Sequence, residues 1–123
     1  MWRKLSLFTL VLFFSSCGRD LPALEGIDLP KWKEDKNGCG GYRESVDDVL
    51  QQELSQLKGL SEMDIISLLG KPDQNELYKR NQKFFYYFIS PGSSCKGSSA
   101  TPLKLILRFN AMGYAQLVSM EKD

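Results

Sequence analysis

The chain has 123 residues, of which 42% are hydrophobic and 25% are charged, and its formal net charge is +1 at pH 7. This length accommodates one small domain, and the charge balance gives no electrostatic support for binding nucleic acid. The sequence contains no His, which excludes Ser-His and Cys-His nucleophilic catalysis and removes the commonest ligand of transition metals. We therefore expect a protein with no cofactor and no bound metal.

Residues 1–16 have the pattern of a secretory signal. Arg3 and Lys4 provide the positive start, a mostly apolar run covers residues 5–14, and two Ser residues follow. A helix of about ten residues spans about 15 Å, which is half of the bilayer core. A cleaved signal is therefore favoured over a permanent transmembrane helix.

Cys17 directly follows one aromatic and two small residues at positions 14–16. This arrangement resembles the lipobox of bacterial lipoproteins, in which the signal is cut before the Cys and the Cys carries acyl chains that anchor the protein. The resemblance implies a lipidated Cys17, a mature chain of 107 residues and a tether over residues 17–30. Because Gly18 stands where an Asp retains many such proteins at the inner membrane, it favours an outer-membrane anchor facing the periplasm. An ordinary cleaved signal with a structural Cys nearby is the alternative.

Residues 18–30 are interrupted by Pro22, Gly26 and Pro30 and show no regular period, which is typical of a tether. Four apolar residues are unusual for a free linker, and they leave open whether the segment lies along the domain or along a partner. These residues are Leu21, Leu24, Ile27 and Leu29.

Cys39 and Cys95 remain once Cys17 is assigned to lipid. An even pair in an oxidising compartment is typical of a structural disulfide, and a loop of about 56 residues would contribute roughly 4 kcal/mol in the chain-entropy model. Two Cys without His do not supply the four ligands of a structural zinc site, and the Cys-x-x-Cys spacing of redox pairs is absent. The glycines around Cys39 indicate tight backbone turns.

A first long helix is predicted to begin at Ser45 and to end before Gly59, with Asp47 and Asp48 in its first turn and Ser45 as the capping residue. A second, shorter helix has the same capping spacing from Ser61 and ends at Gly70. Apolar residues recur at helical spacing on one face of the first helix. They are Val46, Val49, Leu50, Leu54 and Leu57.

The rest of the chain is strand-like. Residues 75–78 form a short predicted strand, residues 84–89 form a strongly aromatic one, and residues 103–109 alternate apolar and charged side chains. A turn at residues 110–113 then leads into a last strand over residues 114–119, with a charged end that frays. Two helices followed by consecutive strands indicate an α+β fold.

Three short motifs carry a family resemblance. Gly-Leu-Ser-Glu at 59–62 opens the second helix, Leu-Leu-Gly-Lys-Pro-Asp at 68–73 ends it, and Leu-Ile-Leu-Arg-Phe-Asn at 105–110 follows the aromatic strand. Over residues 44–119 the chain resembles small bacterial outer-membrane lipoproteins of the SmpA/OmlA (BamE-like) type. The resemblance implies two N-terminal helices packed on a three- to four-stranded antiparallel β-meander (ααβββ), within a single domain of residues 31–123.

The resemblance and the anchor together imply a non-catalytic binding or scaffold module of the cell envelope, an accessory to outer-membrane assembly or integrity. The membrane and outer-membrane or other envelope proteins would be its partners. A small inhibitor or immunity-type protein that binds a periplasmic enzyme is the alternative. A hydrolase that uses Asp64, Asp73 and Glu76 is disfavoured, because the sequence shows no activated nucleophile or base.

Aromatic side chains provide the candidate partner-binding residues. The strand over residues 84–89 has bulky residues on both faces, and the face that the helices leave free would be exposed unless the tether or a partner covers it. Trp32 either caps the core or offers a platform to a ligand. The predicted partner-binding residues are Trp32, Phe85 and Tyr87.

Overall fold

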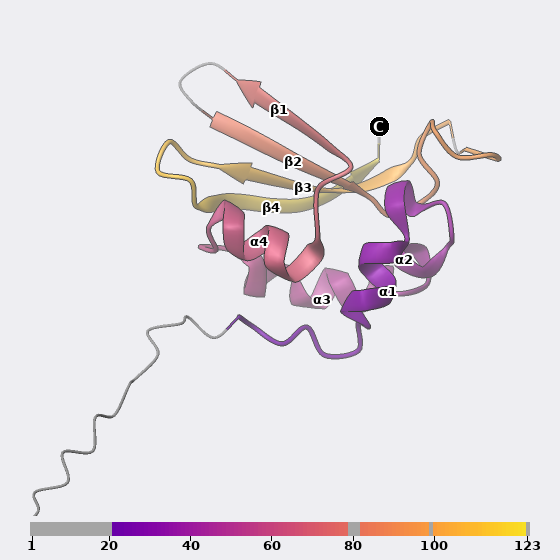
Figure 1. Cartoon of the computed structure of the whole chain (residues 1–123), viewed down its shortest axis with the longest axis horizontal. Helices are drawn as coiled ribbons and strands as arrows, with labels where there is room; N and C mark the ends of the chain where they lie inside the picture. Colours follow the sequence, from indigo (N-terminus) through magenta and orange to yellow (C-terminus); the bar gives the residue numbers. More distant parts are fainter. Residues whose placement is uncertain (1–20, 79–81, 99, 123) are drawn as a thin grey trace, which may run out of the picture.

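The structure is a computed structural model that describes residues 21–78, 82–98 and 100–122. Helices gather on one face of a four-stranded antiparallel sheet with strand order β1-β2-β3-β4 (Figure 1). The predicted α+β class and antiparallel sheet are therefore confirmed. The described helices are α1 (Leu29–Glu34), the 3-10 helix η1 (Lys36–Gly38), α2 (Tyr42–Ser45), α3 (Asp47–Leu57) and α4 (Glu62–Leu69), and the strands are β1 (Gln74–Tyr78), β2 (Gln82–Phe88), β3 (Leu103–Phe109) and β4 (Ala115–Lys122).

The capping signals predicted α4 correctly and α3 only in part. The Ser61 hydroxyl accepts from the Asp64 amide and the Asp64 carboxylate accepts from the Ser61 amide, so the capping box is present. At the start of α3 the N-cap is Val46. The prediction of Ser45 as a cap was wrong, because Ser45 is the last residue of α2 and its hydroxyl donates to the Tyr42 carbonyl.

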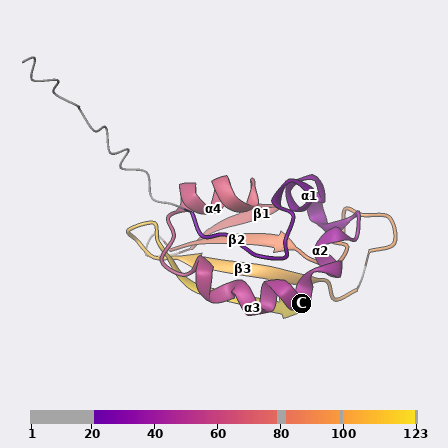
Figure 2. The same cartoon turned by 90° about the horizontal axis from the view of Figure 1, so that it is seen from below.

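Residues 21–30 lie along the folded domain, which is one of the alternatives that the sequence left open for the segment. Leu24 and Ile27 are buried in the core, and α1 already begins at Leu29 after a cap by the Asp28 carboxylate. From below, residues 21–28 run across the helical side of the sheet between α4 and α3 (Figure 2). The apolar residues in this segment are there because they cover the core.

The sheet is longer than the sequence suggested. β4 continues to Lys122, which pairs with Leu103, so the predicted fraying of the charged end was wrong. A register shift lies between Arg108 and Phe109, and such bulges are common near the end of a strand pair.

The core lies between the helices and one face of the sheet. Strand residues alternate between faces, so Phe85 and Tyr87 of β2 point to the helices together with Leu105 and Leu107 of β3. The facing helices and residues 21–28 contribute the buried side chains Leu24, Ile27, Trp32, Leu50, Leu57, Ile65, Leu68 and Leu69.

Candidate functional site

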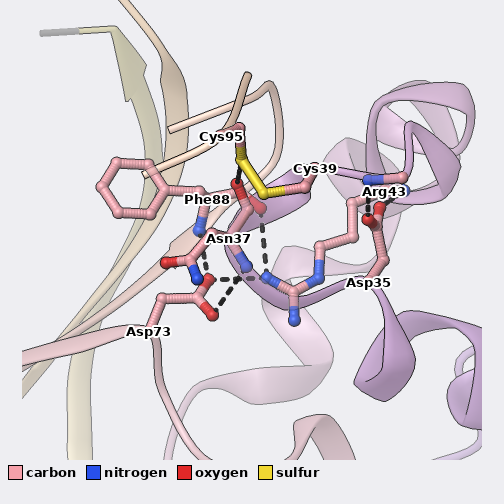
Figure 3. The surroundings of a disulfide bond; sticks show 8 residues. Asp35, Asn37, Cys39, Arg43, Asp73, Phe88 and Cys95 are labelled. Atoms are coloured by element: carbon pink, nitrogen blue, oxygen red, sulfur yellow. Dashed lines mark hydrogen bonds and ion pairs between the residues drawn. A yellow bond between two sulfur atoms is a disulfide. The ribbon is translucent and has the colours of Figure 1, made fainter. Parts of the chain in front are cut away.

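A buried ion pair joins the N-terminal helices to the sheet beside the disulfide (Figure 3). The Arg43 side chain is 1% exposed, and its Nη1 lies 2.6 Å from Asp73 Oδ2. The guanidinium also donates from Nη1 to the Phe88 carbonyl and from Nε to the Trp32 carbonyl, and it lies 4.7 Å above the Trp32 ring. Because a buried charge needs a partner and hydrogen bonds, this pair fixes how α2 meets β2.

The two carboxylates around Arg43 hold backbone amides. Asp73 accepts from the amides of Asn37 and Phe88 at 3.0 and 2.8 Å. Asp35, 6% exposed, accepts from the amides of Gly40 and Arg43. Asp73 thus ties residue 37 to the end of β2, and Asp35 closes the turn over residues 35–43, so both carboxylates have structural roles.

The expected disulfide is present. Cys39 and Cys95 are bonded at a Cα–Cα distance of 5.3 Å, 56 residues apart in sequence. Close backbone approach explains Gly38 beside it, because Gly38 has φ 68° and a Cβ there would lie 2.9 Å from the Ile89 carbonyl oxygen. Cys17, the predicted lipid-bearing residue, lies outside the described residues.

The three predicted partner-binding residues are buried. Trp32 and Tyr87 are 0% exposed and Phe85 is 4% exposed. The Tyr87 hydroxyl donates to the Gly70 carbonyl at 2.7 Å, and burial raises the pKa of Tyr87 well above its ordinary value, with Arg43 lowering it and Asp73 raising it. These aromatic side chains belong to the core and are not available to a partner, which corrects their assignment to a binding surface.

The structure gives each of the three candidate hydrolytic carboxylates a separate role. Asp64 belongs to the capping box of α4, Asp73 pairs with Arg43, and Glu76 accepts from the Tyr86 hydroxyl at 3.1 Å.

The opposite face of the sheet is a better candidate for binding. We call it the open sheet face, and within the described residues Figure 1 shows no helix or strand lying over it. The Phe84 and Tyr86 rings stack at 6.2 Å, and the Lys104 ammonium lies 4.7 Å from the centre of the Tyr86 ring. Register places the following side chains on this face: Glu76 of β1, Phe84 and Tyr86 of β2, Lys104, Ile106 and Arg108 of β3, and Leu117 of β4.

Arg108 is the charged residue of this face whose hydrogen bonds are incomplete. It pairs across the sheet with Phe84 and Leu117, and its Nε is buried without a hydrogen-bond partner among the described residues. Leu117 beside it is 44% exposed. Arg108 as a whole is partly exposed, and a guanidinium next to exposed apolar surface favours an incoming carboxylate accompanied by an apolar side chain.

The prediction of Phe85 and Tyr87 as partner-binding residues was wrong, because both lie on the buried face of β2. Phe84, Phe85, Tyr86 and Tyr87 are all aromatic, so the strand has no apolar–polar alternation from which to assign its inner face. The usable signal is on β3, where Lys104 and Arg108 alternate with apolar residues and pair with Phe88 and Phe84.

No helix within the described ranges is both long and apolar enough to cross a bilayer. Among the same residues, no group of three or more Cys, Asp or Glu side chains is arranged to hold a metal ion. Comparison of the chain with protein-family models, with curated proteins and with solved structures finds no match.

Proposed function

We propose that this protein is a lipid-anchored, non-catalytic binding or scaffold module of the bacterial cell envelope. In this proposal residues 1–16 are a signal, Cys17 carries the lipid anchor at the outer membrane, and the domain lies in the periplasm. The disulfide between Cys39 and Cys95 supports an oxidising compartment. The helix pair α3–α4 followed by an antiparallel meander supports the SmpA/OmlA (BamE-like) arrangement, with α1 and α2 as additions.

The open sheet face is the proposed binding surface. It combines stacked aromatic rings, exposed Leu117 and the partly exposed Arg108 on one side of the sheet. Aromatic and Arg side chains dominate the binding energy of protein interfaces. The partner is an envelope protein that places a carboxylate on Arg108 and an apolar side chain on Leu117.

Capture of partners after mild crosslinking tests this function. The wild-type chain and the double variant Arg108→Gln/Leu117→Ser are expressed with an affinity tag, crosslinked in intact cells and purified from membranes. The wild-type chain is expected to retain a discrete envelope protein that the double variant loses. Lys71→Gln, which removes an exposed cation elsewhere, is the charge-matched control and keeps the partner.

Thermal unfolding of the purified variants shows whether they remain folded. Recovery of no envelope protein by the wild-type chain, or equal recovery by the wild-type chain and the double variant, would overturn the proposal.

An inhibitor or immunity-type protein is the second candidate, because the disulfide-bonded domain presents aromatic side chains on its sheet. A tight complex with a periplasmic enzyme that loses its activity would favour this candidate.

A further inference from the structure

One end of the molecule, here called the hairpin end, is formed by the start of α4, the β3–β4 turn and the neighbouring ends of β1 and β2. The Glu62 amide donates to the Gly113 carbonyl at 3.1 Å. The Lys83 ammonium lies 2.8 Å from the Glu62 carboxylate, and Lys83 pairs with Leu77 across β1 and β2. These contacts bring the start of α4, the β3–β4 turn and the adjoining ends of β1 and β2 to the same end of the sheet, and the disulfide lies at the other.

Large exposed hydrophobic side chains collect at the hairpin end. Met63 at the start of α4 is 70% exposed, Leu77 near the end of β1 is 72% exposed, and Met112 in the β3–β4 turn is 79% exposed. Tyr114, which bridges to Ser61, is 39% exposed. Because these residues come from separate segments and do not serve the core, they indicate a surface that contacts an apolar phase.

The chain enters the described structure at the same end. Figures 1 and 2 both show the segment that begins at residue 21 starting beneath α4, on the side of the β3–β4 turn. Leu21 packs against the core, so its position is set by the domain. Cys17 lies four residues earlier in the sequence, and four extended residues reach at most about 14 Å.

We propose that the hairpin end rests on the lipid bilayer, with Met63, Leu77, Met112 and Tyr114 in its interfacial region. This inference rests on the proposed lipidation of Cys17, because the short reach holds this end next to the acyl chains. Exposed apolar side chains add to the membrane affinity of a lipid anchor. In this orientation only the hairpin end of the sheet contacts the membrane, and the open sheet face remains accessible to an envelope protein.

Quenching of tryptophan fluorescence by brominated lipid tests the orientation. The full chain is produced with its own signal in Gram-negative cells and purified from membranes, and the mass of the product reports lipidation. Variants Met112→Trp and Lys96→Trp are reconstituted into phosphatidylcholine vesicles with brominated acyl chains. Lys96 is exposed in the loop at the disulfide end, and Trp32, which is 0% exposed, provides the same internal reference in both variants.

The fluorescence of the tryptophan introduced in Met112→Trp is expected to be quenched in brominated vesicles and retained in unbrominated ones. The fluorescence of the tryptophan introduced in Lys96→Trp is expected to be retained in both. A lipidated Met112→Trp chain that is not quenched overturns the orientation and leaves the proposed function standing. A chain without lipid on Cys17 overturns both. Quenching of Lys96→Trp alone would place the disulfide end on the membrane and would also contradict the inference.

Discussion

At the scale of single residues, Arg43 and Asp73 are the charged pair on which the junction of helices and sheet depends. Both side chains are almost fully buried, at 1% and 4% exposure. Removing one member of such a pair leaves the other charged and desolvated, which costs more than the pair itself contributes. Neither residue stood out in the sequence as a partner of the other, because 30 positions separate them.

We predict that Arg43→Met lowers the free energy of unfolding by about 3–5 kcal/mol, because the Asp73 carboxylate loses its cation. The free energy of unfolding of the double variant Arg43→Met/Asp73→Asn should fall by less, since the side-chain amide oxygen at position 73 still accepts a hydrogen bond and no charge is buried. Lys83→Met is the control, because its pair with Glu62 is partly exposed and such pairs contribute roughly 0–1 kcal/mol. Denaturant unfolding measures all three, and equal losses for the single and double variants would contradict the assignment.

Tyr87 should make the protein less stable in alkali. Burial raises the pKa of its hydroxyl in the folded state, so the unfolded chain releases this proton first, above its ordinary pKa of about 10. The stabilising contribution is therefore complete below about pH 10 and decreases as the pH rises further. Between about pH 9 and about pH 11, the free energy of unfolding should decrease less for Tyr87→Phe than for the wild-type chain. A Tyr87→Phe chain with an unchanged pH dependence would show that Tyr87 does not titrate in this way.

The assignment of side chains to faces is the part of the site that the sequence could not decide. Aromatic residues occupy consecutive positions of β2, and both faces of the strand therefore have the same composition. Phe85 and Tyr87 turn inward because α4 and Trp32 of α1 pack there: Tyr87 bonds to Gly70, and Trp32 lies 6.4 Å from its ring. These partners are known only once the helices are placed.

At the scale of elements, local signals were reliable where one segment contains them all. α4 has its cap, its apolar residues and its terminating Gly70 within ten residues, and it was predicted closely. The segment from Leu29 to Ser45 contains α1, η1 and α2, which are only six, three and four residues long. Isolated helices of this length are marginal, so tertiary contacts such as those of Trp32, Asp35 and Arg43 determine them.

The disulfide joins residue 39, after η1, to the loop between β2 and β3. We predict that Cys39→Ala/Cys95→Ala lowers the free energy of unfolding by roughly 4 kcal/mol, because the loop of 56 residues is no longer closed in the unfolded chain. Reductant should destabilise the wild-type chain by a similar amount and leave the double variant unchanged. A double variant as stable as the wild-type chain would show that Asp35, Arg43 and Asp73 alone hold this junction.

The segment before α1 provides a separate test of the fold. Leu24 is 4% exposed, so Leu24→Ala should cost about 2–5 kcal/mol, as expected for a buried Leu. Ala23→Ser, at the exposed neighbouring position, should change the stability by less than about 0.5 kcal/mol. Thermal or denaturant unfolding distinguishes them, and equal stability of the two variants would mean that the segment is a free tether.

At the scale of the whole molecule, the helices and residues 21–28 cover one face of the sheet, and no described helix or strand lies over the other (Figure 1). With the hairpin end on the bilayer, the open sheet face would stand beside the membrane, where envelope proteins lie. The anchor and the compartment were expected from the first 17 residues of the sequence. The face that meets a partner could be assigned only from the three-dimensional arrangement.

We propose that the anchored domain binds an envelope protein through its open sheet face. Site-specific photocrosslinking in living cells tests it most directly, with a photoreactive amino acid at Phe84 on that face or at Gln51, which is exposed on α3. We predict a discrete adduct with an envelope protein from Phe84, none from Gln51, and loss of the Phe84 adduct in Cys17→Ser. Adducts of equal yield from both positions, or none from Phe84, would contradict the account.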